Sequence, residues 1–358
     1  MGRQFTGVNL RFRMGMLSLV VLFVTAPAAK GQEQGEDDRA AVEENTTKRG
    51  QTGFKFLRTS VSARAAAMGD AMTAMEAGSI AMFYNPATMA YMTEFANVAV
   101  GITQFFAEIN YNSASIAVAP AHGRYGVFGL SFMNVDYGDL EGTIRVDNER
   151  GYDDYGTFSP TALMVGVGYA KALTDRFALG SNVKYAVQNL GDALVQAGGN
   201  GSGEAWQGNK ESTVAVDVGV IYNTGFESLK FAMSARNFSR EVTYHEENFE
   251  LPLLLTIGMS MDITDLMAAD QSVHSLVLAV DAYRPRDFYE ALNIGAEYGF
   301  MDVLYIRGGY VYPTDEQGIS LGAGVNAGLS GIGLSADYAY TNFGLLGDIH
   351  RISMQFGF

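Results

Sequence analysis

The chain has 358 residues, a formal net charge of −15 and no cysteine. Its acidic balance excludes the basic footprint that nucleic-acid binding requires, and without cysteine it has neither disulfides nor thiolate metal ligands. It has 42 glycines, 22 phenylalanines and 19 tyrosines against only 7 prolines, which favours strands and tight turns over helices.

Residues 1–28 have the three-part pattern of a secretory signal peptide. Three arginines precede an apolar run over residues 14–26, and small residues follow at Ala26-Pro27-Ala28. The apolar run has about thirteen residues, which is too short to cross a bilayer as a helix. We therefore expect export and cleavage, with a retained N-terminal anchor as the alternative. Cleavage would remove three arginines and no acid, taking the formal charge from −15 to −18.

Two segments follow the predicted signal peptide. Residues 29–51 are polar and charged without a periodic apolar face, which predicts a flexible linker. Residues 52–92 are rich in small residues and methionine, and they carry an apolar face at helical spacing. The pattern predicts a helix with Met68, Ala71, Met72 and Met75 on one face. It also predicts a second short helix that begins at a Ser79 cap and ends at Phe83.

The segment over residues 52–92 contains the corner Asn85-Pro86-Ala87. Pro86 forces Asn85 out of helical geometry, and an asparagine side chain can hydrogen-bond the backbone of a turn. We expect these residues to fix the segment in place, with a gating role as the alternative. Because only strands follow it, we predict that the segment is a hatch, or plug, inside a barrel; a packed helical hairpin is the alternative.

Residues 93–358 change to a period of two. Around Asp217, for example, Val214, Val216 and Val218 alternate with small or polar residues. We count about fourteen such segments, many of which reach the roughly nine to eleven residues that cross a bilayer when tilted. The sequence therefore predicts an all-β fold, an antiparallel transmembrane β-barrel of about fourteen strands. A soluble β-sandwich or β-helix is the alternative.

The predicted connections differ between the two ends of the barrel. Those after even-numbered strands are mostly tight, whereas two long loops, over residues 138–157 and 191–210, follow odd-numbered strands. Short turns on one side and long loops on the other are typical of outer-membrane barrels. An even strand count places both chain ends on the short-turn, periplasmic side, where we expect the hatch to enter.

One face of the predicted strands is aliphatic and aromatic, and the other is small and polar with isolated charges. A charge on the lipid face is costly, so we expect these charges to face the lumen. A buried arginine needs a partner, so we expect Arg64 to pair with Asp217, Asp281 or Glu297. The predicted lumen charges are Asp217, Asp281, Glu297, Arg307 and Asp337.

The sequence contains no catalytic constellation. Its four histidines, at positions 122, 245, 274 and 350, are scattered without metal-ligand spacing. The glycine-rich run over residues 198–203 lacks the lysine and the strand-to-helix setting of a phosphate loop. We therefore expect no enzyme activity, no cofactor and no metal site.

Three stretches carry a resemblance to a known family. FLRTSVSARAAAMGDA and AGSIAMFYNPATMA are similar to the N-terminal signature of the PorV/PorQ family of outer-membrane proteins, which belongs to the FadL-like barrels. The alternating C-terminal RISMQFGF resembles the strand by which such barrels are recognised for assembly. The resemblance implies a fourteen-stranded barrel in the outer membrane of a Bacteroidetes-like bacterium. It assigns the hatch motif to Arg64, Gly69, Asn85, Pro86 and Ala87.

Two functions fit this resemblance. The first is a type IX secretion component that binds exported proteins or secretion machinery with its long loops, while its lumen stays plugged. The alternative is a FadL-like passive channel for a hydrophobic small molecule. In that case we expect an apolar pocket beside the hatch, lined by Met72, Met75, Met82 and Phe83. Both functions place the barrel wall in outer-membrane lipid.

Overall fold

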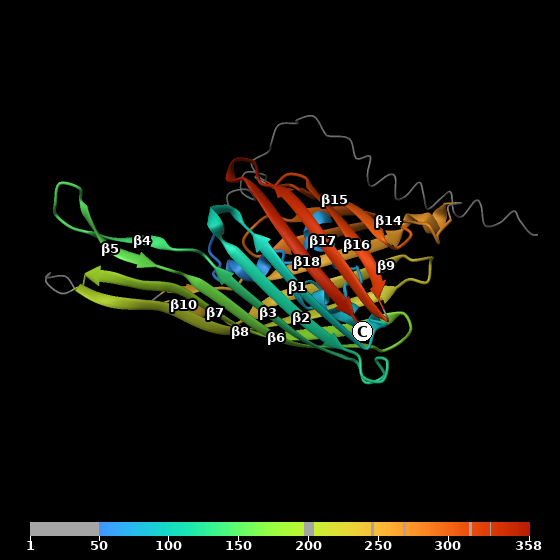
Figure 1. The fold of residues 1–358 in the computed structure, drawn as a ribbon. Helices are drawn as coiled ribbons and strands as arrows, with labels where there is room; N and C mark the ends of the chain where they lie inside the picture. Colours follow the sequence, from blue (N-terminus) through green and yellow to red (C-terminus); the bar gives the residue numbers. More distant parts are fainter. Residues whose placement is uncertain (1–49, 197–203, 245–246, 268–269, 315–316, 330) are drawn as a thin grey trace, which may run out of the picture.

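The computed structural model describes residues 50–196, 204–244, 247–267, 270–314, 317–329 and 331–358. Within these ranges, fourteen antiparallel strands close into one barrel whose first strand, β1, pairs with the last, β18 (Figure 1). The prediction of an all-β, fourteen-stranded antiparallel barrel is therefore confirmed. The predicted signal peptide over residues 1–28 and nearly all of the predicted linker lie outside the described residues.

The barrel strands are nine to twelve residues long, as a tilted bilayer crossing requires, except that β7 and β8 have 20 residues each. Their bounds are β1 (Ala96–Gln104), β2 (Asn110–Val118), β3 (Val127–Asp136), β6 (Thr161–Ala172), β7 (Phe177–Gln196), β8 (Glu204–Asn223), β9 (Lys230–Ser239), β12 (Leu254–Asp262), β13 (His274–Pro285), β14 (Ala291–Phe300), β15 (Leu304–Tyr312), β16 (Ser320–Leu329), β17 (Ile332–Asn342) and β18 (Asp348–Gly357).

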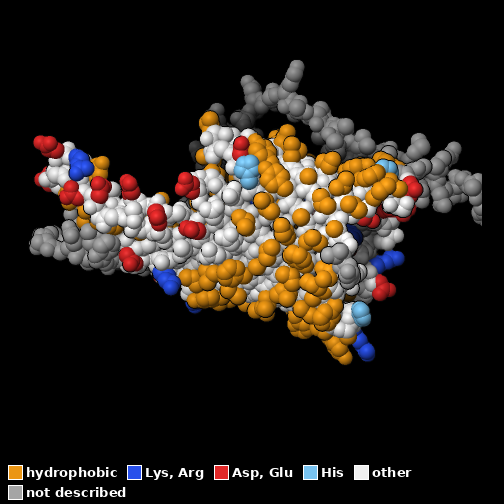
Figure 2. All heavy atoms as spheres, viewed as in Figure 1, with side chains coloured by type: hydrophobic (Ala, Val, Ile, Leu, Met, Phe, Trp, Pro, Cys, Tyr) orange, Lys and Arg blue, Asp and Glu red, His pale blue; other side chains and the backbone are white. Residues whose placement is uncertain are grey.

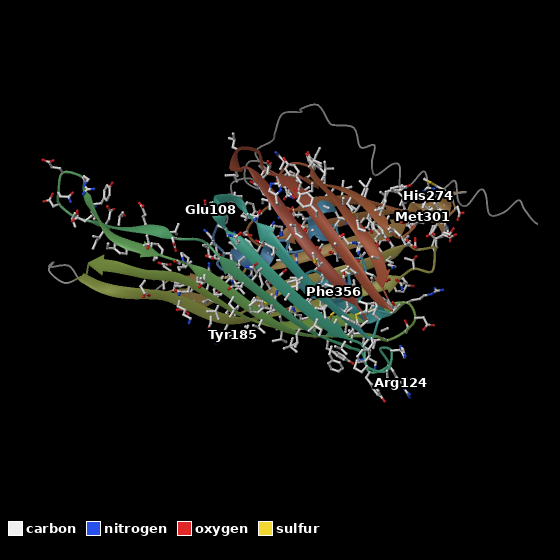
Figure 3. The ribbon with its side chains drawn as sticks, in the orientation of Figure 1. Glu108, Arg124, Tyr185, His274, Met301 and Phe356 are labelled. Carbon is white, nitrogen blue, oxygen red and sulfur yellow. The ribbon has the colours of Figure 1, made fainter. Side chains whose placement is uncertain are left out.

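The barrel wall is apolar outside and polar inside. On β8, Val214 and Val218 are each 51% exposed, whereas Asp217 between them is 1% exposed and faces the lumen. Apolar side chains spread over the outer surface of the barrel, and Tyr185 projects from it (Figures 2 and 3). The alternation follows from the period of two in the sequence, which sends successive side chains to opposite faces of a strand.

The two rims of the barrel differ. The short-turn rim carries the turns over residues 173–176 and 301–303 together with Phe358, and Figure 3 shows Arg124 and Met301 at this end. The long-hairpin rim carries two small sheets, β4 (Leu140–Arg145) with β5 (Tyr152–Phe158) and β10 (Val242–Tyr244) with β11 (Glu247–Phe249).

The long loops expected over residues 138–157 and 191–210 are largely strands. Residues 138–157 form most of β4 and β5, and β7 and β8 continue pairing past the barrel as far as Gln196 and Glu204 (Figure 1). The expectation of long loops was therefore wrong for these paired residues, whereas residues 197–203 lie outside the described ranges. Strand pairing continues because it satisfies the backbone hydrogen-bonding groups that a loop would leave to water.

The hatch, residues 52–92, runs through the whole lumen. It begins at the long-hairpin rim, where Thr52 bridges to Glu250 and the ring of Phe54 stacks on Phe249 at 6.0 Å between centroids. It leads into Phe95 at the opposite rim, whose backbone N–H donates to the Phe358 carbonyl over 2.8 Å. The expectation that the hatch enters from the short-turn side was therefore wrong. At the long-hairpin rim, the Phe249 ring and the Asp287 carboxylate hold the first residues of the hatch.

The hatch is made of short helical turns: η1 (Lys55–Arg58), α3 (Ala63–Ala67), η2 (Gly78–Phe83) and η3 (Pro86–Tyr91). The predicted helix through Met68 and Met75 does not form, because Gly69 and Asp70 adopt φ of +61° and +63° and end α3. The short helix ending at Phe83 is present, but no side chain caps it. Across the described residues, no helix is long and apolar enough to cross a membrane.

The path of the hatch predicts which side of the membrane its first residues reach. Because long hairpins of such barrels face the cell exterior, a Gln51→Cys variant of this cysteine-free chain should react with a membrane-impermeant maleimide in intact cells. Arg150→Cys, in the β4–β5 hairpin, should react as well. Arg124→Cys, on the short-turn rim, should react only after the outer membrane is permeabilised. If Gln51→Cys behaves like Arg124→Cys, the direction of the hatch is wrong.

Candidate functional site

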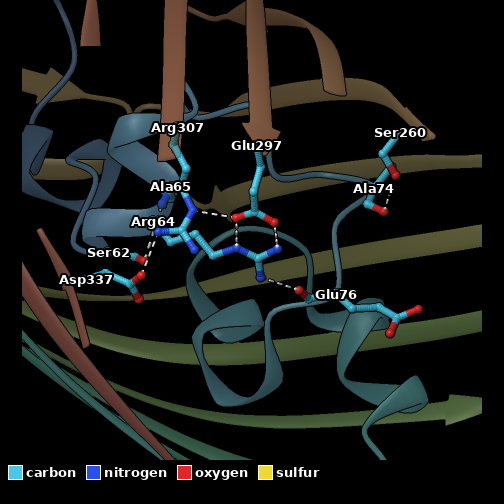
Figure 4. A network of polar contacts seen from close by, with 9 residues as sticks. All are labelled: Ser62, Arg64, Ala65, Ala74, Glu76, Ser260, Glu297, Arg307 and Asp337. Atoms are coloured by element: carbon cyan, nitrogen blue, oxygen red, sulfur yellow. Dashed lines mark hydrogen bonds and ion pairs between the residues drawn. The ribbon is translucent and has the colours of Figure 1, made fainter. Parts of the chain in front are cut away.

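A ladder of four alternating charges fastens the hatch to the barrel wall (Figure 4). The guanidinium of Arg64 donates two hydrogen bonds to Glu297, from Nε over 2.8 Å and from Nη2 over 2.7 Å. Glu297 on β14 also pairs with Arg307, directly opposite on β15, and Arg307 Nη1 donates to Asp337 on β17 over 2.6 Å. Two cations thus meet two carboxylates, so the buried group is neutral.

Of the three partners that the sequence suggested for Arg64, the structure pairs it with Glu297. Burial of a guanidinium is costly, and the ion pair with the adjoining Glu297 carboxylate offsets this cost. Its Nη1 also donates to the Glu76 carbonyl, within the hatch, over 2.9 Å. Arg64 therefore ties the two halves of the hatch to each other as well as to the wall.

Asn85 satisfies the hatch backbone at the start of η3. Its Oδ1 accepts from the Ala87 N–H over 3.0 Å, and its Nδ2 donates to the carbonyls of Thr73, over 2.8 Å, and Val220, over 3.2 Å. The side chain is fully buried. Pro86 occupies the first helical position, where its missing N–H costs nothing.

Two glycines of the wall let this motif approach the strands. A Cβ added at Gly219 on β8 would lie 1.9 Å from Asn85 Oδ1, and one added at Gly180 on β7 would lie 2.6 Å from the Ala87 nitrogen. Neither clash is tolerable, so no side chain fits at either position. This role was not predicted from the sequence, although both glycines stand at inward positions of strands with an alternating pattern.

The other predicted lumen charges also hold polar groups together. Asp281 on β13 accepts from the Thr73 N–H over 2.9 Å. Asp217 accepts from Lys184 over 2.8 Å and from the Asn237 N–H over 2.7 Å. Asn237 has a φ of +63° and belongs to a bulge where the pairing of β8 with β9 shifts. All five predicted lumen charges are buried.

At the long-hairpin rim, Asp287 fixes the first turn of the hatch. It accepts from Thr52 Oγ1 over 2.7 Å and pairs with Lys55. Burial by itself would raise the pKa of Asp287, but the hydrogen bonds from Lys55 and Thr52 lower it below its usual value.

The methionines expected to line an apolar pocket are packed instead. Met72, Met75 and Met82 are buried in the main hydrophobic cluster, and they line neither of the two large chambers described below. Met82 packs directly against the wall: a Cβ at Gly129 or Gly168 would fall 2.6 or 2.3 Å from its sulfur. Phe83 packs partly buried against the same cluster.

Two chambers lie on opposite sides of the hatch. The first, of about 500 Å³, opens toward the short-turn rim and is lined by residues that include Arg64, Glu76, Tyr91 and Gln355. The second, of about 540 Å³, opens toward the long-hairpin rim and is lined by residues that include Arg58, Arg236, Arg351 and Asp70. Arg236 and Arg351 were not among the lumen charges predicted from the sequence, although their strand positions face inward.

In the part of the chain that the structure describes, no group of three or more His, Asp or Glu residues is arranged to hold a metal ion. The site consists of the polar and packing contacts that hold the hatch, with a chamber on each side.

The ladder predicts a large stability loss when its central carboxylate is removed. Glu297→Gln leaves the buried Arg307 and the partly buried Arg64 beside a neutral amide, which should lower the free energy of unfolding by about 3 kcal/mol. Urea unfolding of the barrel in lipid vesicles measures this loss. The control is Glu290→Gln: that side chain is 67% exposed, and its pair with Arg284 should contribute less than about 1 kcal/mol. Equal losses in the two variants would contradict the role of the ladder.

Comparison with solved structures places the fold among hydrocarbon channels. The toluene transporter TodX of Pseudomonas putida is 13% identical with a TM-score of 0.52, over 82% of this chain and 96% of that one. The CymD monoaromatic hydrocarbon channel is 14% identical with a TM-score of 0.51, over 83% and 96%. At these identities the likeness shows the fold alone.

Comparison at the level of sequence identifies the family. No curated protein matches the chain. A family model described as "Type IX secretion system protein PorV" matches residues 42–261, more than half of the chain, from before the hatch into β12. The barrel, its interior segment and this match agree, and the chain belongs to the PorV family of outer-membrane β-barrel proteins.

Proposed function

We propose that this barrel is a type IX secretion component that binds exported proteins at its long-hairpin rim. The observation that carries the proposal is the PorV family match over residues 42–261. The geometry supports it in two ways: the rim extends into a projecting arm, and the lumen is occupied by the hatch.

The arm is a rigid platform outside the membrane. β7 and β8 continue pairing from Asp192 to Gln196, past the last β6 partner at Asn189. At about 3.3 Å per residue, the seven residues from Leu190 to Gln196 project roughly 20 Å beyond the barrel. The β4–β5 hairpin extends in the same direction beside them (Figure 1). Paired strands hold their shape without a partner, so binding costs them little ordering entropy.

The arm is acidic. Residues 138–158 contain six acidic residues and two arginines, so this hairpin has a formal charge of −4. Acidic side chains are prominent along the arm in Figure 2. A surface of one sign attracts partners of the other sign and speeds their association. The partner surface that fits the β4–β5 hairpin is therefore basic.

The hatch makes the lumen unsuitable for passing a polypeptide. It contacts strands on all sides of the barrel, and its packed centre separates the two chambers. The role that fits is capture or transfer of proteins at the rim, without conduction and without catalysis.

A FadL-like passive channel for hydrophobic small molecules is the second candidate. The observation that favours it is a chamber on each side of the hatch, in a fold shared with hydrocarbon channels. A route between the chambers would require the hatch to move and the charge ladder to separate.

If exported proteins bind at the arm, shortening its β4–β5 hairpin should reduce their recovery. Replacing residues 142–156 with an Asn-Gly turn keeps the pairing of Glu141 with Thr157 and removes the tip of the β4–β5 hairpin. Tagged protein is purified from native outer membranes in mild detergent, and its partners are quantified by mass spectrometry. Exported proteins recovered with the intact chain should fall at least about tenfold with the shortened chain, as expected when a principal contact region is lost.

The control shortens a connection on the opposite rim, by replacing residues 120–125 with the same turn. This variant should retain the exported proteins. Recovery that is unchanged by the first replacement, or lost equally in both, would contradict the proposal. Recovery of an apolar small molecule without protein partners would support the channel instead.

A further inference from the structure

The outer half of β8 is a strand that is paired on one side only. β8 pairs with β7 from Tyr222 out to Glu204, whereas its pairing with β9 ends at Ala215. Residues 204–214 therefore continue past the last β9 partner. Among the described residues, no other strand pairs with β8 along this side. The arm thus has one strand edge whose backbone is left without a ladder.

The pairing with β7 shows which backbone groups this edge presents. The Asn223 N–H donates to the Arg176 carbonyl over 2.7 Å, where β8 meets the start of β7. Successive residues of a strand direct their N–H and C=O groups to opposite sides, so the odd-numbered residues of β8 face β7. The even-numbered residues, which include Trp206, Gly208 and Lys210, direct theirs to the unpaired edge.

The one irregularity in the outer ladder leaves this alternation intact. The register shifts between Asn189 and Asp192 on β7, whose partners are Lys210 and Gly208 on β8. Two residues of β7 thus lie opposite one residue of β8, so the extra residue belongs to β7. β8 itself stays regular, and its even-numbered residues face the same side out to Glu204.

The other neighbours of the ribbon lie elsewhere. Both strands of the β4–β5 hairpin contact β7 beside the arm (Figure 1). β10 lies near the base of the arm, where the Tyr244 hydroxyl donates to the Gln188 carbonyl over 3.3 Å, but it pairs with β11. Gly208 and Lys210, farther out, are exposed. The open part of the edge is therefore its outer part, residues 204–210.

This edge lacks the features that normally block strand addition. Exposed edges are usually protected by proline, by bulges in the edge strand, by charges or by a short length. Residues 204–210 contain no proline, have no bulge of their own and include Lys210 as their only cation. At about 3.3 Å per residue they offer roughly 20 Å of strand. Such an edge is a template for an extended segment of another chain.

Charge argues against a second copy of this chain as the occupant. The β4–β5 hairpin on the same arm has a formal charge of −4, so two arms that paired edge to edge would bring like charges together. A neutral or basic segment meets no such repulsion. The acidic arm therefore favours a partner of the opposite sign, as proposed above for exported proteins.

We propose that exported proteins dock by adding one extended strand to the outer edge of β8. The incoming strand pairs with the backbone N–H and C=O groups of Trp206, Gly208 and Lys210. Main-chain hydrogen bonds supply affinity without requiring a fixed sequence, so one edge can accept many different proteins. This docking mode rests on the proposed function, because it presumes that exported proteins bind the arm.

Proline substitutions test the edge without removing the N–H groups that face β7. Gly208→Pro/Lys210→Pro deletes two N–H groups of the open edge, a position at which a strand tolerates proline. The matched control, Gly208→Ala/Lys210→Ala, removes the same charge but keeps both N–H groups. Each tagged full chain is purified from native outer membranes in mild detergent, and co-purified exported proteins are quantified by mass spectrometry. Recovery should be at least about tenfold lower with the proline variant than with the alanine variant. Equal recovery with the two variants would overturn the proposal.

Hydrogen exchange supplies a second measurement that needs no variant. The intact chain is compared alone and together with its co-purified exported proteins. The amides of Trp206, Gly208 and Lys210 should exchange at least about tenfold more slowly in the complex, because strand addition gives each of them an acceptor. Unchanged exchange at these amides would overturn the proposal even if the proline variant failed to fold.

The remaining outcomes separate this docking mode from the proposed function. If shortening the β4–β5 hairpin abolishes recovery but the proline variant retains it, exported proteins bind another surface of the arm, and strand addition alone is wrong. If the intact chain recovers no exported proteins, both proposals fail. A dimer of the intact chain that becomes monomeric in the proline variant, with exported proteins retained, would assign the edge to a second copy and overturn the proposal.

Discussion

The ion pair between Arg64 and Glu297 is the interaction on which the rest of the interior depends. A barrel of fourteen strands leaves a lumen too wide for its own side chains to fill, so the hatch must occupy it. The hatch brings a partly buried cation, whose charge is costly to bury unless a carboxylate meets it. Glu297 meets it, and Arg307 and Asp337 keep the group neutral. The charges that hold the hatch therefore also join three barrel strands.

Close packing against the barrel wall holds the hatch in addition to the charges. Asn85 and Ala87 rest on wall positions where only glycine fits, and Met82 rests on two more glycines. Polar groups of the hatch are thus satisfied by the wall, and apolar groups are packed against it. The hatch therefore divides the lumen into two chambers, one on each side of it. The arm lies outside the lumen, so the hatch can close the lumen without covering the surface at which we propose that exported proteins bind.

The fold could be predicted from the sequence because its signals are local. A period of two over residues such as Val214 to Val218 specifies a strand and its faces, and the number of such segments gave the barrel. The hatch helix through Met68 could not be predicted correctly, because the left-handed turn at Gly69 overrides helical spacing. The direction of the hatch depends on contacts of Thr52 and Lys55 with residues about 200 positions away, such as Glu250 and Asp287. Nothing near Arg236 in the sequence shows that it shares a chamber with Arg351.

The central claim is that the hatch closes the lumen, and ion conductance in planar lipid bilayers tests it most directly. The full chain should show no steady conductance, because its polar and apolar groups are paired with the wall across the whole lumen. A chain that lacks residues 53–92 should conduct, since a fourteen-stranded barrel without an interior segment leaves a water-filled path. Steady conductance of the full chain, as large as that of the shortened one, would contradict the account.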